Sequence, residues 1–161
     1  MVSIADVLAE HGPMLARIAS SYEADPAIRQ DLIQDMSVGV WRALPKWRGD
    51  APLRSYVARV AQNHGVDHIS RAMSRRESEL IDVHVDPAAD PERSADLDQR
   101  RDRLLQAVRR LPVGQRQVVV LSLEGFSQRE IADVLGLEEN TINQRLSRAR
   151  KQLRAWLEEA A

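Results

Sequence analysis

The sequence lacks cysteine altogether, which excludes disulfide scaffolds, zinc fingers and thiol redox chemistry within the chain. Aromatic residues make up only 4% of it. No run approaches the roughly 20 uncharged apolar residues that a membrane-spanning helix needs. The first six residues show no basic start followed by an apolar block, so no secretory signal is expected. These absences predict a soluble cytoplasmic protein without membrane insertion.

The 161 residues carry a net charge of only −1, but the charges are segregated along the chain. Positions 46–76 hold seven basic residues against two acidic ones, and positions 77–98 hold eight acidic residues against one arginine. Positions 140–154 hold five basic residues and no acidic one. Two basic blocks separated by an acidic stretch indicate two polyanion-binding surfaces, although two solvated helix faces remain an alternative.

Hydrophobic periodicity is helical throughout, which predicts an all-α protein of two small helical domains joined by an acidic flexible linker. We expect the domains at 1–76 and 100–161 and the linker at 77–99, where Pro87 and Pro91 lie. The expected helices cover 27–44, 53–73, 100–111, 114–123, 127–135 and 138–158. Neither domain is large enough for a deep catalytic cleft. A further hypothesis is that the acidic linker lies against the basic patches when DNA is absent.

The second domain contains the signals of a helix-turn-helix. Ser127 and Glu130 have the spacing of a capping box, which starts a helix. Gly136 is suited to end that helix in a left-handed conformation, and the small Ala132 permits a close crossing by the next helix. A tight turn between two closely crossing helices is the helix-turn-helix geometry.

The last helix has one apolar face and one face suited to DNA. At about 100° per residue, the apolar face gathers Ile142, Leu146, Ala149 and Leu153. The opposite face carries hydrogen-bonding groups and no acidic residue: Asn140, Gln144, Ser147, Arg148 and Lys151. Asn and Gln read adenine edges and Arg reads guanine, while Arg145 on the flank suits phosphates. The pattern predicts a recognition helix, with a purely structural helix pair as the alternative.

In the first domain, the helix at 31–44 presents an unusual outer face. Trp41 and Val38 lie there among acidic and amide groups, which is typical of a protein-interaction surface. The alternative is that Trp41 folds back onto a neighbouring helix.

The next helix combines an apolar stripe with basic residues. Leu53, Tyr56, Val57 and Val60 form the expected core stripe. Away from it point Arg54, Arg59 and Gln62, and Arg71 lies toward the helix end. Asn63 and Asp67 are expected to lean toward the core side, where they either orient the helix end or touch nucleic acid.

His64 and His68 have the spacing of a zinc-binding H-x-x-E-H motif with Asp in place of Glu. No further histidine belongs to a matching motif, and the block is embedded in a basic patch. A metal-dependent enzyme is therefore only a remote hypothesis, and we expect no cofactor.

Both halves together resemble the sigma-70 family, specifically the small two-domain sigma factors of the extracytoplasmic-function (ECF) type. The stretch 31–41 is similar to the polymerase-binding helix of that family, and 47–49 with 56–71 resembles its promoter-opening segment. The stretches 111–116, 125–135 and 141–150 resemble its final domain. The resemblance implies a transcription initiation factor, not an enzyme, that binds core RNA polymerase and promoter DNA. It also implies an anti-sigma factor as a partner and a cytoplasmic location at the nucleoid.

The residue patterns and the resemblance together give three candidate sets. The polymerase-binding set is Asp31, Gln34, Asp35, Ser37, Val38 and Trp41. The set for the unpaired strand of the −10 element is Arg48, Gly49, Asp50, Arg54, Arg59, Asn63 and Arg71. The set for the −35 element is Asn140, Asn143, Gln144, Arg145, Ser147, Arg148 and Lys151.

Two departures from the family pattern bear on these sets. Tyr56 stands where Trp is usual, and Asn143 and Gln144 stand where a basic residue and Ser are common. The latter two predict an adenine-containing −35 element. The alternative function is an autonomous helix-turn-helix regulator that binds duplex DNA alone, although it leaves the outer face around Trp41 unexplained.

Overall fold

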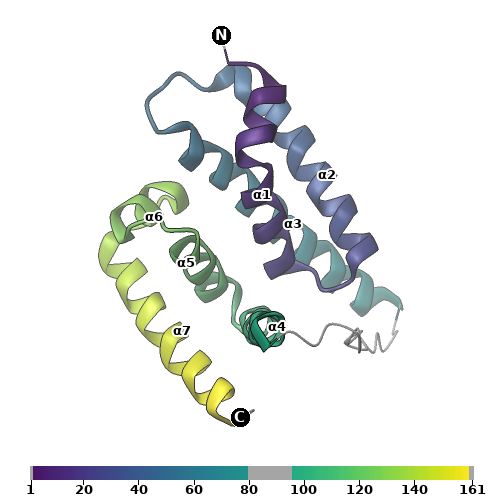
Figure 1. Ribbon diagram of the computed structural model, residues 1–161, viewed down its shortest axis with the longest axis vertical. Helices are drawn as coiled ribbons and strands as arrows, with labels where there is room; N and C mark the ends of the chain where they lie inside the picture. Colours follow the sequence, from purple (N-terminus) through teal and green to yellow (C-terminus); the bar gives the residue numbers. More distant parts are fainter. Residues whose placement is uncertain (1, 80–95, 160–161) are drawn as a thin grey trace.

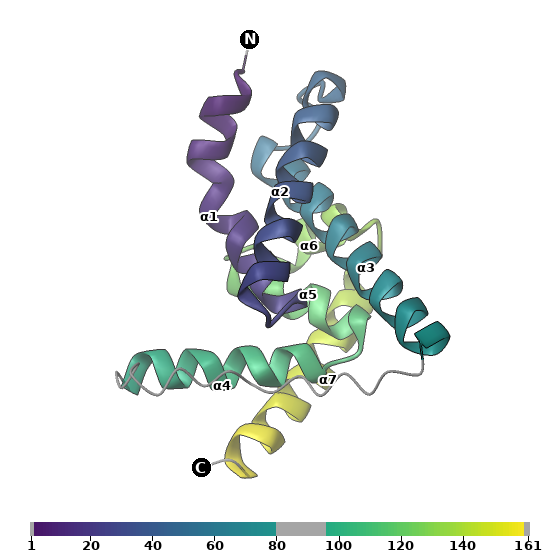
Figure 2. The same cartoon turned by 90° about the vertical axis from the view of Figure 1, so that its right-hand side faces the viewer.

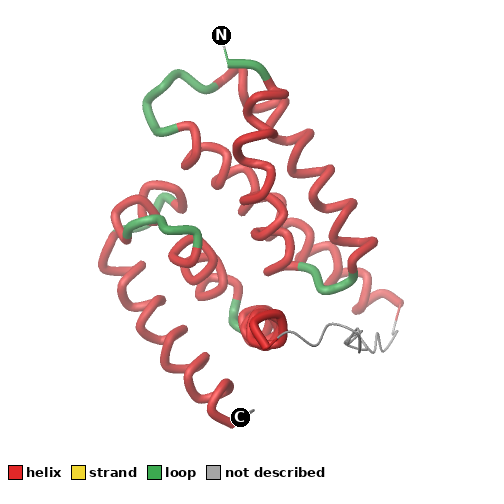
Figure 3. The backbone as a smooth tube through the Cα atoms, viewed as in Figure 1, coloured by secondary structure: helices red, strands yellow, loops and turns green. Residues whose placement is uncertain are grey.

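The computed structural model describes residues 2–79 and 96–159, with side chains described for 2–76 and 96–159. The first part contains α1 (Ile4–Tyr22), α2 (Pro26–Ala43), the short 3₁₀ helix η1 (Leu44–Lys46) and α3 (Leu53–Glu79). The second contains α4 (Asp96–Arg110), α5 (Val113–Leu123), α6 (Gln128–Leu135) and α7 (Glu139–Glu159). Figure 3 shows helices and loops and no strand in these two parts. The prediction of an all-α fold is confirmed.

Helices α1, α2 and α3 form a three-helix bundle around a shared apolar core (Figure 1). Asp25 accepts hydrogen bonds from the amides of Ala27 and Ile28, and Pro26 occupies the first turn, so local chemistry starts α2 at this point. Leu15 of α1 and Met36 of α2 are fully buried in that core. Burial of such apolar side chains is the main stabilising term of a bundle this small.

Two helices extend farther than their apolar pattern predicts. α3 continues to Glu79 instead of ending near Met73, and α4 begins at Asp96 instead of Arg100. Apart from Leu97 the added segments are polar, and they contain no Gly or Pro, while Asp96 and Asp98 favour the first turn of α4 through the helix dipole. Residues 80–95, and with them most of the predicted linker and its suggested contact with the basic patches, lie outside the described residues.

The helix-turn-helix is formed as the capping signals predict. The Ser127 hydroxyl accepts from the Glu130 amide at 3.1 Å, and the Glu130 carboxylate accepts from the Ser127 amide at 2.9 Å. Gly136 has φ of 66°, and the Leu137 amide donates to the Ala132 carbonyl at 3.0 Å. This turn sets α7 across α6, so the outer face of α7 stays open for a partner.

The two halves of the chain pack against each other. α4 lies along the end of α1, and α5 and α6 face α1 and α3 (Figures 1 and 2). The sequence patterns predict two joined domains but do not predict this packing, which determines how the candidate surfaces are presented.

Candidate nucleic-acid interface

Helix α7 buries the predicted face. Ile142, Leu146, Ala149 and Leu153 are all buried, and they fix the rotation of the helix about its axis. The opposite side presents exposed polar groups: Asn140, Asn143, Gln144, Ser147, Arg148 and Lys151. A row of amides, hydroxyls and cations on one exposed helical face can reach base edges and phosphates in a major groove.

Arg145 differs from the other members of the −35 set because it is half-buried. Its guanidinium lies against the first turn of α5, where a Cβ atom at Gly114 would come within 3.0 Å of its Nη1. Glycine at position 114 permits this approach. Arg145 also lines a cleft together with residues of α3, so it lies toward the contact between the two halves, at the margin of the outward face of α7.

The outer face of α2 is exposed as predicted. Trp41 is 58% exposed and Val38 is 43% exposed, so the alternative in which Trp41 folds back is wrong. Acidic and amide side chains flank them at Asp31, Gln34 and Asp35, all exposed. Ser37 is half-buried, and its hydroxyl donates to the Ile33 carbonyl at 2.9 Å. The result is an apolar patch with an acidic border, the composition of a protein-binding surface.

The loop between η1 and α3 is held in place by two aromatic residues. Trp47 Nε1 donates to the Ala51 carbonyl at 2.8 Å, and the Tyr56 hydroxyl donates to the Ala43 carbonyl at 2.9 Å. The tip of the loop carries three exposed members of the −10 set, Arg48, Gly49 and Asp50. Gly49 has φ of 84°, so the tip uses a conformation that glycine adopts without strain.

On α3, Arg59, Asn63 and Arg71 are exposed. Two expectations for this helix are wrong: Asn63 and Asp67 do not lean toward the core, and Gln62 does not point outward but is only 1% exposed. The physical reason is that the buried stripe of α3 is wider than the predicted core stripe and is shifted around the helix toward small residues. The stripe includes Ala58, Ala61 and Gly65.

Tyr22 of α1 explains this rotation. Its ring packs so closely on Gly65 that a Cβ there would lie 2.5 Å from the ring carbons. Its hydroxyl donates a hydrogen bond to Gln62 Oε1, and burial raises the pKa of the Tyr22 phenol. The small residues Ala58 and Ala61 beside Gln62 were the sequence signal that this side of α3 is buried. A count of apolar residues along the helix misses the signal, because Gln62 itself is polar.

Arg54, a member of the −10 set, is occupied in the contact between the two halves. Its guanidinium lies 4.2 Å from the centre of the Phe126 ring and donates a hydrogen bond to the Glu124 carbonyl. In the described arrangement this side chain holds the second half against α3, and it would have to leave Phe126 before contacting nucleic acid.

Further polar contacts between the halves involve residues that the sequence analysis did not single out. Arg17 Nε lies 2.5 Å from Glu124 Oε1, and this hydrogen bond raises the pKa of Arg17. Arg109 Nε donates to the Ser20 carbonyl at 2.8 Å, and burial lowers the pKa of Arg109. These partners lie far apart in the sequence, so no local pattern could indicate them.

The described residues contain no group of three or more His, Asp or Glu side chains placed to hold a metal ion. His68 Nε2 lies 2.9 Å from Glu23 Oε1, whereas His64 packs against Gly39 of α2. The two histidines thus have different partners, His68 at the residue that follows α1 and His64 on α2. Across 2–79 and 96–159, none of the helices has the combined length and apolar character of a membrane span.

Comparisons with known proteins agree with the two-part organisation. Residues 7–75 match the family described as Sigma-70 region 2, and residues 101–153 match Sigma-70, region 4. The RNA polymerase sigma factor CnrH of Cupriavidus metallidurans is 30% identical over 162 residues, which cover 94% of this chain and 85% of CnrH. The ECF RNA polymerase sigma factor SigM of Mycobacterium tuberculosis is 34% identical over 140 residues, covering 86% of this chain and 67% of SigM.

Solved structures of sigma factors share the arrangement. CnrH in complex with the cytosolic domain of CnrY superposes with a TM-score of 0.71 at 29% identity, covering 98% of this chain and 89% of that one. RpoE from Bartonella quintana, in complex with the anti-sigma factor NepR, superposes with a TM-score of 0.73 at 25% identity, covering 94% of each chain. The chain therefore belongs to the sigma-70 family, as an RNA polymerase sigma factor of the ECF type that directs the polymerase to promoters.

Proposed function

We propose that the three candidate surfaces divide the work of promoter recognition. The α2 surface around Trp41 binds core RNA polymerase. The 48–50 loop and the exposed side of α3 hold the unpaired strand of the −10 element, and the outward face of α7 reads the −35 element. The boundaries that go with these roles are a first domain at 1–76 and a second at 100–161, joined by the stretch 77–99.

One observation supports this division most directly. An exposed apolar patch with acidic neighbours on α2 and an acid-free polar face on α7 occur in one chain, on different helices. An autonomous DNA-binding regulator needs the face on α7 but has no use for an exposed Trp41 and Val38. A factor that joins polymerase to DNA needs both surfaces.

Strand opening follows from capture of bases, without hydrolysis of a nucleotide. Unstacking costs a few kcal/mol per step, and binding of the unpaired strand by basic and amide groups offsets that cost. Arg59, Asn63 and Arg71 lie on the same helix as the loop's anchor Tyr56, so loop and helix act as one rigid surface. The protein in this proposal is a binding factor without catalytic activity, and it acts in the cytoplasm at the nucleoid.

An anti-sigma factor is the proposed regulatory partner. CnrH is seen in complex with the cytosolic domain of CnrY, and RpoE is seen in complex with the anti-sigma factor NepR. The α2 patch would be a natural target, because covering Trp41 would also block the polymerase.

The test is co-elution with bacterial core RNA polymerase on a sizing column. The double variant Gln34→Ala/Asp35→Ala should lose the complex while keeping its affinity for duplex DNA. The matched control Gln128→Ala/Asp133→Ala removes the same groups from exposed positions on α6 and should co-elute like the original protein. Failure of the unaltered protein to bind core, together with tight binding to duplex DNA alone, would contradict the proposal and favour the autonomous regulator.

A further inference from the structure

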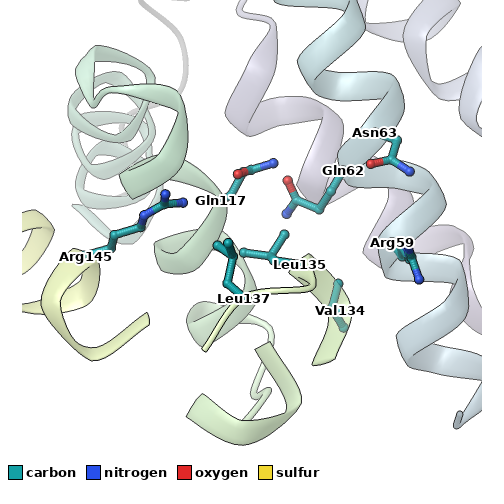
Figure 4. A pocket seen from close by; sticks show the side chains of 8 residues that line it. All are labelled: Arg59, Gln62, Asn63, Gln117, Val134, Leu135, Leu137 and Arg145. Atoms are coloured by element: carbon teal, nitrogen blue, oxygen red, sulfur yellow. The ribbon is translucent and has the colours of Figure 1, made fainter. Parts of the chain in front are cut away.

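A polar cleft of about 300 Å³ lies between the two halves of the molecule. α3 contributes Arg59, Gln62 and Asn63, α5 contributes Gln117, and α7 contributes Arg145 (Figure 4). The remaining lining residues are apolar, and none is acidic. The cleft thus combines two guanidinium groups and three amides with no negative charge to balance them.

Gln62 brings an unsatisfied donor into this cleft. Its side chain is almost completely buried, and its Oε1 accepts the hydrogen bond from Tyr22. Its Nε2 has no hydrogen-bond partner among the described residues. Figure 4 shows the amides of Gln62 and Gln117 pointing toward each other from the two sides. A buried amide without an acceptor is unfavourable, so an acceptor entering the cleft would be bound.

Arg145 and the start of α5 add positive polarity at the same place. Pro112 at the N-cap offers no side-chain hydrogen bond, and the first turn of α5 contains no acidic residue. The Arg145 guanidinium nevertheless lies against this turn at Gly114. A cation beside the positive end of a helix dipole is unfavourable until an anion neutralises both.

From these observations we propose that the cleft binds a small phosphate-bearing anion, held by Gln62 and Arg145, with Arg59 at the outer edge of the cleft. Phosphate fits because its oxygens surround a tetrahedral centre and can accept hydrogen bonds from several directions at once. The cleft is at the lower end of the size range of small-molecule sites, roughly 300–1,000 Å³, which suits a phosphate ester or a nucleotide. This inference goes beyond the proposed function, which requires no small ligand.

Binding at this place would couple the ligand to the packing of the two halves. The site exists only while α3 of the first half faces α5 and α7 of the second, so a bound anion favours the packed arrangement. It also occupies Arg145, which belongs to the proposed −35 set. The ligand and promoter DNA should therefore compete.

Calorimetric titration of the full chain with pyrophosphate and with ADP, at constant ionic strength, tests the proposal. Arg145→Ala should weaken pyrophosphate binding at least about tenfold, since it removes a charge-assisted contact, and Arg59→Ala, at the outer edge, should weaken it less. The matched control Arg100→Ala removes an exposed arginine on α4 and should change affinity less than about twofold. Arg59 is exposed, so its truncation leaves the packing of α3 intact.

The Glu124→Ala variant distinguishes anion binding at a formed site between the halves from non-specific electrostatic attraction of anions. Removing a negative charge strengthens unspecific binding, whereas loosening the packed halves weakens binding to a site between them. We expect weaker pyrophosphate binding. Stronger binding by Glu124→Ala, an equal loss in Arg100→Ala, or no binding by the unaltered chain up to about 10 mM would overturn the proposal. Tighter binding of ADP than of pyrophosphate would identify a nucleotide as the source of the phosphate.

Discussion

The carboxylate of Glu124, at the end of α5, forms a two-point ion pair with the guanidinium of Arg17 on α1. The distances are 2.5 Å from Nε to Oε1 and 2.9 Å from Nη2 to Oε2. The Glu124 side chain is 7% exposed, and its backbone carbonyl accepts from Arg54 of α3. One residue of the second half is therefore bound to two helices of the first, which makes Glu124 the principal polar link between the halves.

Glu124→Ala should loosen this contact. Loss of a two-point pair that is half-exposed on the Arg17 side should weaken the packing by about 1 kcal/mol. Because the chain has no cysteine, spin labels at Ala9→Cys and Gln152→Cys report the distance between the halves without background. The distance distribution should broaden toward longer values in Glu124→Ala and not in the control Glu158→Ala, which removes an exposed carboxylate. An unchanged distribution would show that the remaining contacts, among them Arg54 on Phe126 and Arg109 on Ser20, suffice to hold the halves together.

Trp41→Ala should weaken binding to core RNA polymerase without unfolding the protein. The side chain is 58% exposed, so its truncation creates no cavity, whereas an interfacial tryptophan commonly contributes about 2 kcal/mol or more to binding. That corresponds to a loss of about 30-fold in affinity. Met73→Ala removes a side chain that is 60% exposed on α3 and serves as control. Equal losses in the two variants would argue against a specific α2 surface.

Gln144→Arg should shift the −35 preference from adenine toward guanine. Gln pairs with adenine edges and Arg with guanine, with about 1–3 kcal/mol of discrimination per base. The change is measured by letting the full chain select duplexes from a randomised pool and comparing the sequences that each variant binds. Gln152→Arg adds the same charge at another exposed position of α7 and should raise affinity for all sequences alike. If both variants select the same sequences, position 144 does not face the bases.

Ser127→Ala should destabilise the helix-turn-helix by about 1 kcal/mol, because the Ser127 hydroxyl accepts from the Glu130 amide at the start of α6. Chemical denaturation followed by circular dichroism measures the free energy of unfolding. Ser147→Ala, in the interior of α7, removes an exposed hydroxyl that is not a cap and should be neutral or slightly stabilising. A similar loss in both variants would contradict the capping role.

The same capping box gives a pH dependence with a definite sign. The hydrogen bond from the Ser127 amide lowers the pKa of the Glu130 carboxyl below its ordinary value of 4.5. The carboxylate form is thus favoured in the folded state, so its stabilising effect is present above pH 4.5 and is lost as pH falls through the lowered pKa. The difference in unfolding free energy between the unaltered protein and Glu130→Gln should shrink on acidification. A difference independent of pH would show that the charge contributes nothing.

Local rules explain why much of the helical framework is predictable from sequence. The capping box at Ser127, the left-handed Gly136 and the apolar face of α7 depend on residues within a few positions of one another. The rotation of α7 follows from the buried Ile142 and Leu146. The same rules fail on α3, because Tyr22 of another helix decides that Gln62 is buried and Asn63 is not.

The sequence by itself thus determined the helical class, the helix-turn-helix, the exposed apolar patch on α2 and the polar outer face of α7, because 3.6-residue periodicity and caps are local properties. Only the tertiary structure decided that the halves pack together, that Arg54 lies on Phe126, and that Arg59 and Arg145 line one cleft. Arg17 and Glu124 are 107 positions apart, and nothing in the neighbourhood of either indicates the other. Their meeting depends on the summed packing of all the helices between them, which no short pattern encodes.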